Sequence, residues 1–211
     1  MRPTLCEEAL RLGRILAELA PTEPEVHGLI ALMEIQASRA RARVGPSGEP
    51  ILLLEQDRAR WDQLLIRRGL AALERAEGTS YALGPYALQA AVAACHARAR
   101  TADDTDWARI VALYDALAQL APSPVIELNR AVAVSMAFGP VAALEIVDGL
   151  CADARLSGYH LLPSVRGDLL ERLGRYEEAR TEFTRAAALA QNARERTLLL
   201  GRASACGTHL S

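Results

Sequence analysis

Apolar residues recur every three or four positions along most of this 211-residue chain, and that spacing limits the possible folds more than any other feature. It places the apolar side chains on one face of an α-helix. A first stripe consists of Leu5, Ala9, Leu12, Leu16 and Leu19. A second stripe follows the Pro21 to Pro24 break and consists of Val26, Ile30, Met33, Ala37 and Ala40. We expect these two helices to form an antiparallel hairpin.

Proline, glycine and capping residues mark where later helices begin and end. The segment Val44 to Pro50 contains two Gly and two Pro and predicts a loop. Further helices are expected over Arg58 to Ala76, Pro85 to Arg100, Asp106 to Ala121 and Pro124 to Ala137. The acidic segment Asp103 to Asp106 is expected to cap the helix over Asp106 to Ala121. Ser123 is expected to cap the helix that begins with Pro124.

The C-terminal third contains a repeat. Gly139 and Gly174 are 35 residues apart, and each separates two helical segments. This period is close to the roughly 34 residues of a tetratricopeptide unit. The small and large packing residues of the second unit are Gly167, Leu170, Gly174, Tyr176, Ala179, Phe183 and Ala186. Asn192 and Glu195 resemble a capping box that opens a final helix covering the end of the stack.

The predicted fold class is therefore all-α, with antiparallel helical hairpins packed as a tetratricopeptide-like right-handed array that is regular at the C-terminal end. We expect a single domain over residues 1–211, with an N-terminal hairpin (1–45), central helices (55–137) and repeats with a capping helix (138–210). The N-terminal half matches the repeat poorly, so an irregular helical bundle is the alternative.

Composition argues against several classes of function. The formal net charge is −2 and all 24 basic residues are Arg, scattered along helices, so the chain lacks the basic stripe of a nucleic-acid-binding module. The four cysteines, Cys6, Cys95, Cys151 and Cys206, are far apart, which favours buried free thiols over disulfides or a metal site. No apolar run is long enough to cross a bilayer, and no signal peptide opens the chain, so we expect a cytoplasmic protein.

Nothing in the sequence indicates catalysis. The histidines, His27, His96, His160 and His209, have no carboxylate or cysteine at metal-ligand spacing. Hydrolase signatures, phosphate-binding glycine loops and dinucleotide fingerprints are missing. We therefore expect no enzyme activity, no cofactor and no metal.

The segment Leu53 to Asp62 has an unusual composition for a helix start. It gathers carboxylates, guanidiniums, an amide and an indole, and its candidate protein-binding residues are Glu55, Gln56, Asp57, Arg58, Trp61 and Asp62. Trp and Arg are the residue types that carry most binding energy at interfaces. Alternatively, Asp57 simply caps the helix while Arg58 and Asp62 form an i,i+4 ion pair.

Similar polar and aromatic residues occur at three other places, and these complete the candidate protein-binding set. They are Tyr86, Gln89 and His96, then Asp106 and Trp107, then Asn129 and Arg130. Asn129 lies inside a predicted helix, where an amide side chain costs helix propensity. Such residues hold a partner on the concave wall of a helical array, or else form a buried hydrogen-bond network between hairpins.

Six ordered segments resemble a known family. They include Leu5 to Leu12, Glu23 to Val26, Leu54 to Arg58 with Trp61 and Asp62, Gly84 to Ala91, Asp104 to Trp107, and Pro122 to Val125 with Leu128 to Val132. Together they resemble the C-terminal tetratricopeptide-like extension of extracytoplasmic-function (group IV) sigma factors, from about Leu5 to about Arg202. Glu55 stands where Asp is common in the family, and Ala59 where Ser is frequent.

The resemblance implies a regulatory protein-interaction domain that acts in transcription initiation. Its partners would be the sigma regions of the same protein, core RNA polymerase, or both. Promoter DNA would be bound only through N-terminal sigma regions that this chain lacks, so we expect either a fragment or a stand-alone gene product. The alternatives are a free-standing peptide-binding adaptor, and an enzyme or sensor that uses His96, Gln89 and Asn129 in a pocket.

Overall fold

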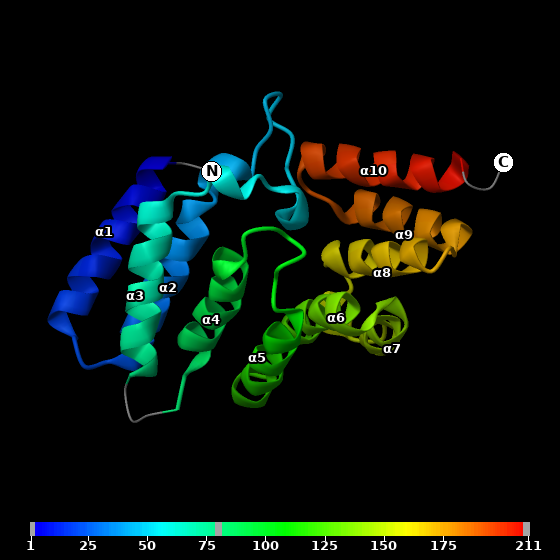
Figure 1. Ribbon diagram of the computed structural model, residues 1–211. Helices are drawn as coiled ribbons and strands as arrows, with labels where there is room; N and C mark the ends of the chain where they lie inside the picture. Colours follow the sequence, from blue (N-terminus) through cyan, green and yellow to red (C-terminus); the bar gives the residue numbers. More distant parts are fainter. Residues whose placement is uncertain (1–2, 79–81, 209–211) are drawn as a thin grey trace. The chain divides into compact units, whose positions relative to one another are not determined.

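The chain is all-α over the residues that the structure describes. The computed structural model covers residues 3–78 and 82–208, and these ranges contain ten α-helices and no strand (Figure 1). The predicted fold class is thus confirmed at the level of helical hairpins. The chain divides into two compact units, residues 1–121 and residues 122–211. His209 lies outside the described residues.

The first unit is built around one central helix, α2. Its helices are α1 (Pro3–Leu19), α2 (Pro24–Ser38), α3 (Gln63–Glu77), α4 (Pro85–Arg98) and α5 (Trp107–Leu120). Helix α2 packs against α1, α3 and α4, while α5 packs against α4 (Figure 1). The core consists of side chains from α2, α3 and α4, among them Ile30, Ile35 and Leu73, with alanines filling the remaining space.

Two glycines let these helices approach closely. A Cβ on Gly28 would lie 2.5 Å from the backbone nitrogen of Ala87 in α4, and a Cβ on Gly69 of α3 would lie 2.6 Å from Ile35. Neither distance is compatible with a real side chain. Small residues therefore set the spacing between α2 and its neighbours, and the many alanines of α4 serve the same close packing.

Helix α1 packs on α2 in an unexpected orientation. The predicted stripe lies on the solvent side: Leu5, Leu12 and Leu19 are 59%, 53% and 77% exposed. The contact is made instead by the opposite face, where Gly13 lies against Ile30 and Met33 of α2. The hairpin itself is confirmed, but the assignment of the α1 stripe to its packing face is wrong.

The second unit contains two hairpins and a final helix. Its helices are α6 (Pro124–Phe138), α7 (Pro140–Leu150), α8 (Leu161–Arg172), α9 (Tyr176–Leu189) and α10 (Ala193–Thr208). Helix α6 packs against α7, α8 against α9, and α10 against α9 (Figure 1). Gly139 and Gly174 have φ angles of 95° and 74°, which L-residues rarely adopt, and each forms the turn of one hairpin. Both predicted hairpin turns are therefore confirmed.

Packing within the second repeat also follows the sequence pattern. A Cβ on Gly167 of α8 would lie 2.8 Å from the ring of Phe183 in α9, so a glycine is needed for the ring to fit. Phe183 is fully buried, and the guanidinium of Arg202 in α10 lies 4.3 Å from its ring centroid. The expected capping box is incomplete, because Asn192 accepts a hydrogen bond from Arg194 while Glu195 lies 3.5 Å from His160.

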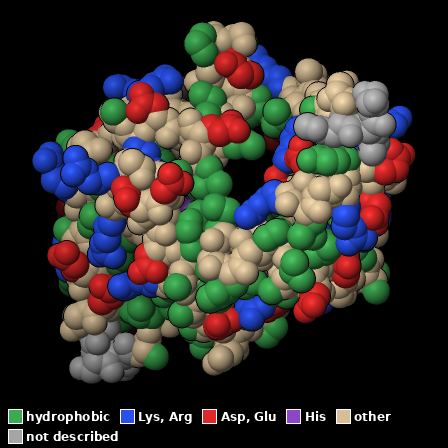
Figure 2. All heavy atoms as spheres, turned by 45° about the vertical axis from the view of Figure 1, so that its right-hand side comes forward, with side chains coloured by type: hydrophobic (Ala, Val, Ile, Leu, Met, Phe, Trp, Pro, Cys, Tyr) green, Lys and Arg blue, Asp and Glu red, His purple; other side chains and the backbone are tan. Residues whose placement is uncertain are grey.

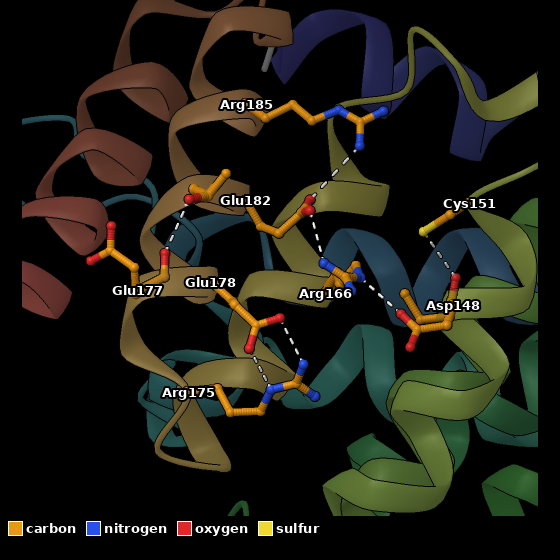
Figure 3. A network of polar contacts seen from close by, with 10 residues as sticks. Asp148, Cys151, Arg166, Arg175, Glu177, Glu178, Glu182 and Arg185 are labelled. Carbon is orange, nitrogen blue, oxygen red and sulfur yellow. Dashed lines mark hydrogen bonds and ion pairs between the residues drawn. The ribbon is translucent and has the colours of Figure 1, made fainter.

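Arg166 of α8 joins three helices of the second unit. Figure 3 shows its guanidinium between Asp148 of α7 and Glu182 of α9, with hydrogen bonds of 2.8 and 2.9 Å. Arg185 approaches the same Glu182 carboxylate, at 4.0 Å. Because Arg166 and Glu182 are largely shielded from solvent, this ion pair depends less on salt concentration than a surface pair does.

The cysteines are free thiols, as predicted, but not all of them are buried. Cys95 and Cys206 are buried, Cys6 is half-buried and Cys151 is exposed. The expectation of burial is wrong for Cys151, because it lies one residue past the end of α7, where the chain turns toward solvent. Among the described residues, no helix has both the length and the apolar content needed to cross a bilayer.

Candidate functional site

The predicted recognition segment forms two short turns before its helix begins. Leu53–Glu55 and Arg58–Arg60 are 3-10 turns, and α3 starts only at Gln63. The Asp57 carboxylate accepts a hydrogen bond from the Ala59 backbone and caps the second turn, while Asp62 accepts from Leu64 and Leu65 and caps α3. The predicted start of a helix at Arg58 is therefore wrong, because Asp57 caps a separate 3-10 turn and the α-helix begins only after its own cap at Asp62.

Trp61 lies inside the first unit and not on its surface. Its side chain is only 3% exposed and packs with Ala42 and Ile66. The guanidiniums of Arg39 and Arg58 lie 5.4 and 5.1 Å from the ring centroid, within cation–π range. The indole thus anchors two arginines that come from different segments.

Arg58 ties the recognition segment to α4 and to the loop before α5. Its guanidinium donates to the backbone carbonyls of His96 and Ala99, the latter at 3.0 Å, and to the Thr105 hydroxyl at 3.2 Å. The ion pair between Arg58 and Asp62, which was the structural alternative for this segment, is not formed, because Asp62 caps α3 and Arg58 binds these other partners. Buried Thr105 belongs to the segment Asp104 to Trp107 noted in the sequence, but it was not among the candidate binding residues.

Arg39 and Gln56 form the other side of this arrangement. Arg39 donates to the Gln56 side-chain oxygen at 3.2 Å, and the Gln56 amide donates to the Ile51 carbonyl at 3.1 Å. We call Arg39, Gln56, Arg58, Trp61 and His96 the tryptophan–arginine cluster. Arg39 was missed from the sequence because it stands in a run of alternating Ala and Arg that offers no distinguishing pattern.

The electrostatic character of the cluster is cationic. Burial, reinforced by Arg39 and Arg58, lowers the pKa of His96 to about 4. Burial together with Arg43 and Arg58 lowers the pKa of Arg39 to about 10, and burial also lowers the pKa of Arg58. His96 is therefore neutral at neutral pH, and its ring packs edge-on against Trp107 at 5.1 Å between centroids.

Glu25 connects the segment Glu23 to Val26 with the segment Gly84 to Ala91. Its two carboxylate oxygens accept hydrogen bonds from the backbone nitrogens of Tyr86 and Ala87, at 2.8 and 3.0 Å, and so cap α4 from another helix. A Cβ on Gly84 would collide with this carboxylate, at 2.4 Å. Glycine at position 84 thus makes room for the cap.

The remaining candidate residues are spread over both units. Glu55, Tyr86 and Gln89 are exposed, and the Gln89 amide donates to the Pro85 carbonyl of its own helix. Asp106 caps α5 through the Arg109 backbone, at 2.9 Å.

Two candidates belong to the second unit. Asn129 is exposed on α6, and Arg130 lies 3.6 Å from Glu127. The structure therefore gathers Gln56, Arg58, Trp61, His96 and Trp107 in the first unit, and places Asn129 and Arg130 in the other.

The described residues hold no group of three or more His, Cys, Asp or Glu side chains arranged to bind a metal ion. His27 is buried and forms a hydrogen bond to the Pro21 carbonyl at 2.8 Å, which agrees with a structural histidine. On the face seen in Figure 2, arginine and acidic side chains are intermingled.

Comparisons with known proteins relate this chain to a longer one. Residues 1–77 match the model of a family described as a family of unknown function (DUF6596), and this stretch includes Arg39, Arg58 and Trp61 but not His96. The "Uncharacterized protein R00370" of Rhizobium meliloti (strain 1021) is 52% identical over 191 residues, which cover 90% of this chain and 44% of that protein. The chain therefore spans less than half of the length of this relative. No solved structure matches the chain.

Proposed function

We propose that this chain is a regulatory protein-interaction domain of an extracytoplasmic-function sigma factor that acts in bacterial transcription initiation. Its partners are the sigma regions of the same protein, core RNA polymerase, or both, and it works in the cytoplasm. Contact with promoter DNA belongs to regions outside this chain. The finer fold proposed with this function is a tetratricopeptide-like right-handed array formed by the hairpins of the second unit.

The observation that carries the proposal is the way the resembling segments are linked in the first unit. Glu25 caps the helix that begins after Gly84, and Arg58 binds both the end of α4 and Thr105. The Asp62 backbone nitrogen also donates to the Ser38 carbonyl. Residues far apart in sequence thus support one another, as expected if the whole set is a module inherited as a unit from the family it resembles.

The size of the Rhizobium meliloti relative also supports the proposal. More than half of that protein lies outside its match to this chain. A regulatory domain needs such a neighbour to act on, and a sigma factor offers one in its polymerase-binding and DNA-binding regions.

Binding to purified partners tests the proposal. The whole chain is immobilised and offered core RNA polymerase of Rhizobium meliloti and, separately, the part of the relative outside the match. We expect retention of at least one of them. Retention of neither partner at micromolar concentrations would refute the proposed function.

A double variant locates the interface on the recognition segment. Glu55→Ala with Asp57→Asn removes two exposed charges, while the asparagine keeps the capping oxygen that the turn needs. We expect weaker retention at an unchanged melting temperature. Glu74→Ala with Glu77→Gln removes the same charge from the exposed end of α3 and serves as the control, so equal weakening in both doubles would exclude this segment as the interface.

A further inference from the structure

A hollow in the first unit is lined by three guanidiniums and by no carboxylate. It has a volume of about 360 Å³ and lies between the Arg58–Arg60 turn, the start of α3 and the C-terminal end of α4. Arg58, Arg98 and Arg100 supply the positive charges, and Trp61 forms part of the wall. The hollow therefore presents a concentrated positive charge, although the whole chain has a net charge of −2.

The three arginines differ in how firmly they are held. Arg58 is fixed by two backbone carbonyls and a hydroxyl, none of which neutralises its charge. Arg98 and Arg100 are exposed, and none of the ion pairs found among the described residues involves them. One fixed and two adjustable guanidiniums are thus available to an anion.

The nearby acidic groups are already engaged in local structure. Asp104 raises the pKa of Arg58, but its carboxylate accepts hydrogen bonds from the Thr101 backbone and hydroxyl, at 3.0 and 2.8 Å. Asp106 caps α5. Both line an adjoining hollow, which shares Arg98 and Arg100 with the one that contains Arg58 and also includes Arg109. Four arginines therefore line the two hollows against two carboxylates, which leaves an excess of positive charge.

The wall of the hollow includes Trp61, which carries a buried hydrogen-bond donor. Its side chain is 97% buried, yet its indole N–H has no acceptor among the described residues. A buried donor without a partner costs about 1–3 kcal/mol, so such groups call for an explanation. An anion that enters the hollow beside Trp61 brings acceptor oxygens to this region.

The surroundings fit carboxylate side chains of a protein. Guanidiniums bind carboxylates and phosphates through two parallel hydrogen bonds, so inorganic phosphate is the competing anion that the experiment below includes. A nucleobase has no platform for stacking, because the Trp61 ring is buried against Arg39 and Arg58. A drug-sized ligand would need a mainly apolar wall, whereas this one includes three arginines and a glutamine.

We infer that the hollow between the Arg58–Arg60 turn and the end of α4 binds aspartate or glutamate side chains of a partner protein. This inference rests on the proposed function, since it assigns the acidic element to the partner named there. The partner's carboxylates meet Arg98 and Arg100 first and are then held beside Arg58. Binding through this hollow should weaken as salt concentration rises.

A pair of double variants tests the inference on the whole chain. Arg98→Ala with Arg100→Ala removes the two exposed guanidiniums of the hollow, and Arg60→Ala with Arg67→Ala removes two exposed arginines that do not line it. We expect the first double variant to bind the retained partner at least ten-fold more weakly, and the control to change affinity less than two-fold. An equal loss in both would show an effect of net charge alone and would overturn the inference.

A direct probe separates this inference from the proposed function. Trp107→Phe leaves Trp61 as the sole tryptophan, so its emission reports on the hollow during titration with a hexa-aspartate peptide. We expect a saturable change that the Arg98→Ala/Arg100→Ala variant loses. Saturation without retention of any partner refutes the proposed function but keeps the carboxylate site. No response to the peptide, or equally tight saturation by inorganic phosphate, overturns the site and leaves the proposed function standing.

Discussion

Gly28 lies where α2 packs closely against α4, and a side chain at this position would not fit. We expect Gly28→Ala to destabilise the first unit by about 1–3 kcal/mol, because the added methyl group would overlap the Ala87 backbone, which cannot move aside without shifting α4. The free energy of unfolding in urea measures the effect.

Gly13→Ala is the matched control for this substitution. Gly13 is also a mid-helix glycine of the first unit, but its Cβ would make ordinary contacts of 3.5 and 3.6 Å with Ile30 and Met33. Helix propensity then favours alanine by up to about 1 kcal/mol. Equal destabilisation by both substitutions would mean that the approach of α2 to α4 does not depend on position 28.

His96 should make the stability of the first unit depend on pH. Its pKa is about 4 in the folded chain and about 6.5 when unfolded, so the unfolded chain binds a proton between these values while the folded chain does not. Stability is therefore lost as the pH falls from about 6.5 toward 4, by something on the order of 3 kcal/mol.

Comparison with His96→Gln isolates this contribution from the carboxylates that titrate in the same range. The unfolding free energy of the wild type should fall relative to that of the variant over this interval. Parallel curves for the two proteins would show that His96 accepts its proton as readily in the folded chain as in the unfolded one.

At the scale of single elements, Glu25 shows how one helix is begun by a residue of another. Its carboxylate binds two of the backbone N–H groups that open α4, so Glu25→Ala should cost about 1–2 kcal/mol of stability in chemical denaturation. Glu23→Ala is the control, because Glu23 precedes α2 without a side-chain capping bond, and it should change stability by less than about 0.5 kcal/mol.

Most helix positions could be predicted from the sequence because their signals are local, the start of α3 being the exception. Proline at the first position marked the starts at Pro85 and Pro124, and glycine marked the turns at Gly139 and Gly174, all as the structure has them. The α1 packing face could not be predicted, because a heptad of leucines looks the same whether it faces a neighbour or solvent.

The candidate site was predictable only in part, for the same reason. Arg58, Trp61 and His96 stood out by residue type, and the structure places them in one cluster. Arg39 and Thr105 join it only through tertiary contacts, which carry no local signature. Trp61 also illustrates a limit of composition, since a residue type common at interfaces proved to be buried.

At the scale of the whole molecule, the second unit has a core of its own. Leu128, Val147, Leu169 and Phe183 come from four different helices of this unit, and each is at most 2% exposed. We therefore expect residues 122–211 to fold when expressed alone, with a helical circular dichroism spectrum and a cooperative thermal transition.

A shorter fragment tests whether the complete hairpin is needed. Residues 140–211 lack α6, which packs against α7, so the apolar face of α7 loses its cover. We expect this fragment to melt without a sharp transition. A broad melt for residues 122–211 as well would show that the second unit depends on residues beyond itself.

Because the leucines of α1 face solvent, they do not help to hold this helix against α2. Arg14 of α1 pairs with the buried Glu34 of α2 at 2.8 Å, but the apolar part of the contact involves Gly13 and other small groups, so little apolar area resists detachment of α1. Its amides should exchange with deuterium well before those of α2, and a protease should nick the chain first around the Ala20–Glu23 connection. Any molecule that covers these leucines would slow both the exchange and the cleavage, so the two rates would show whether this face of α1 is bound.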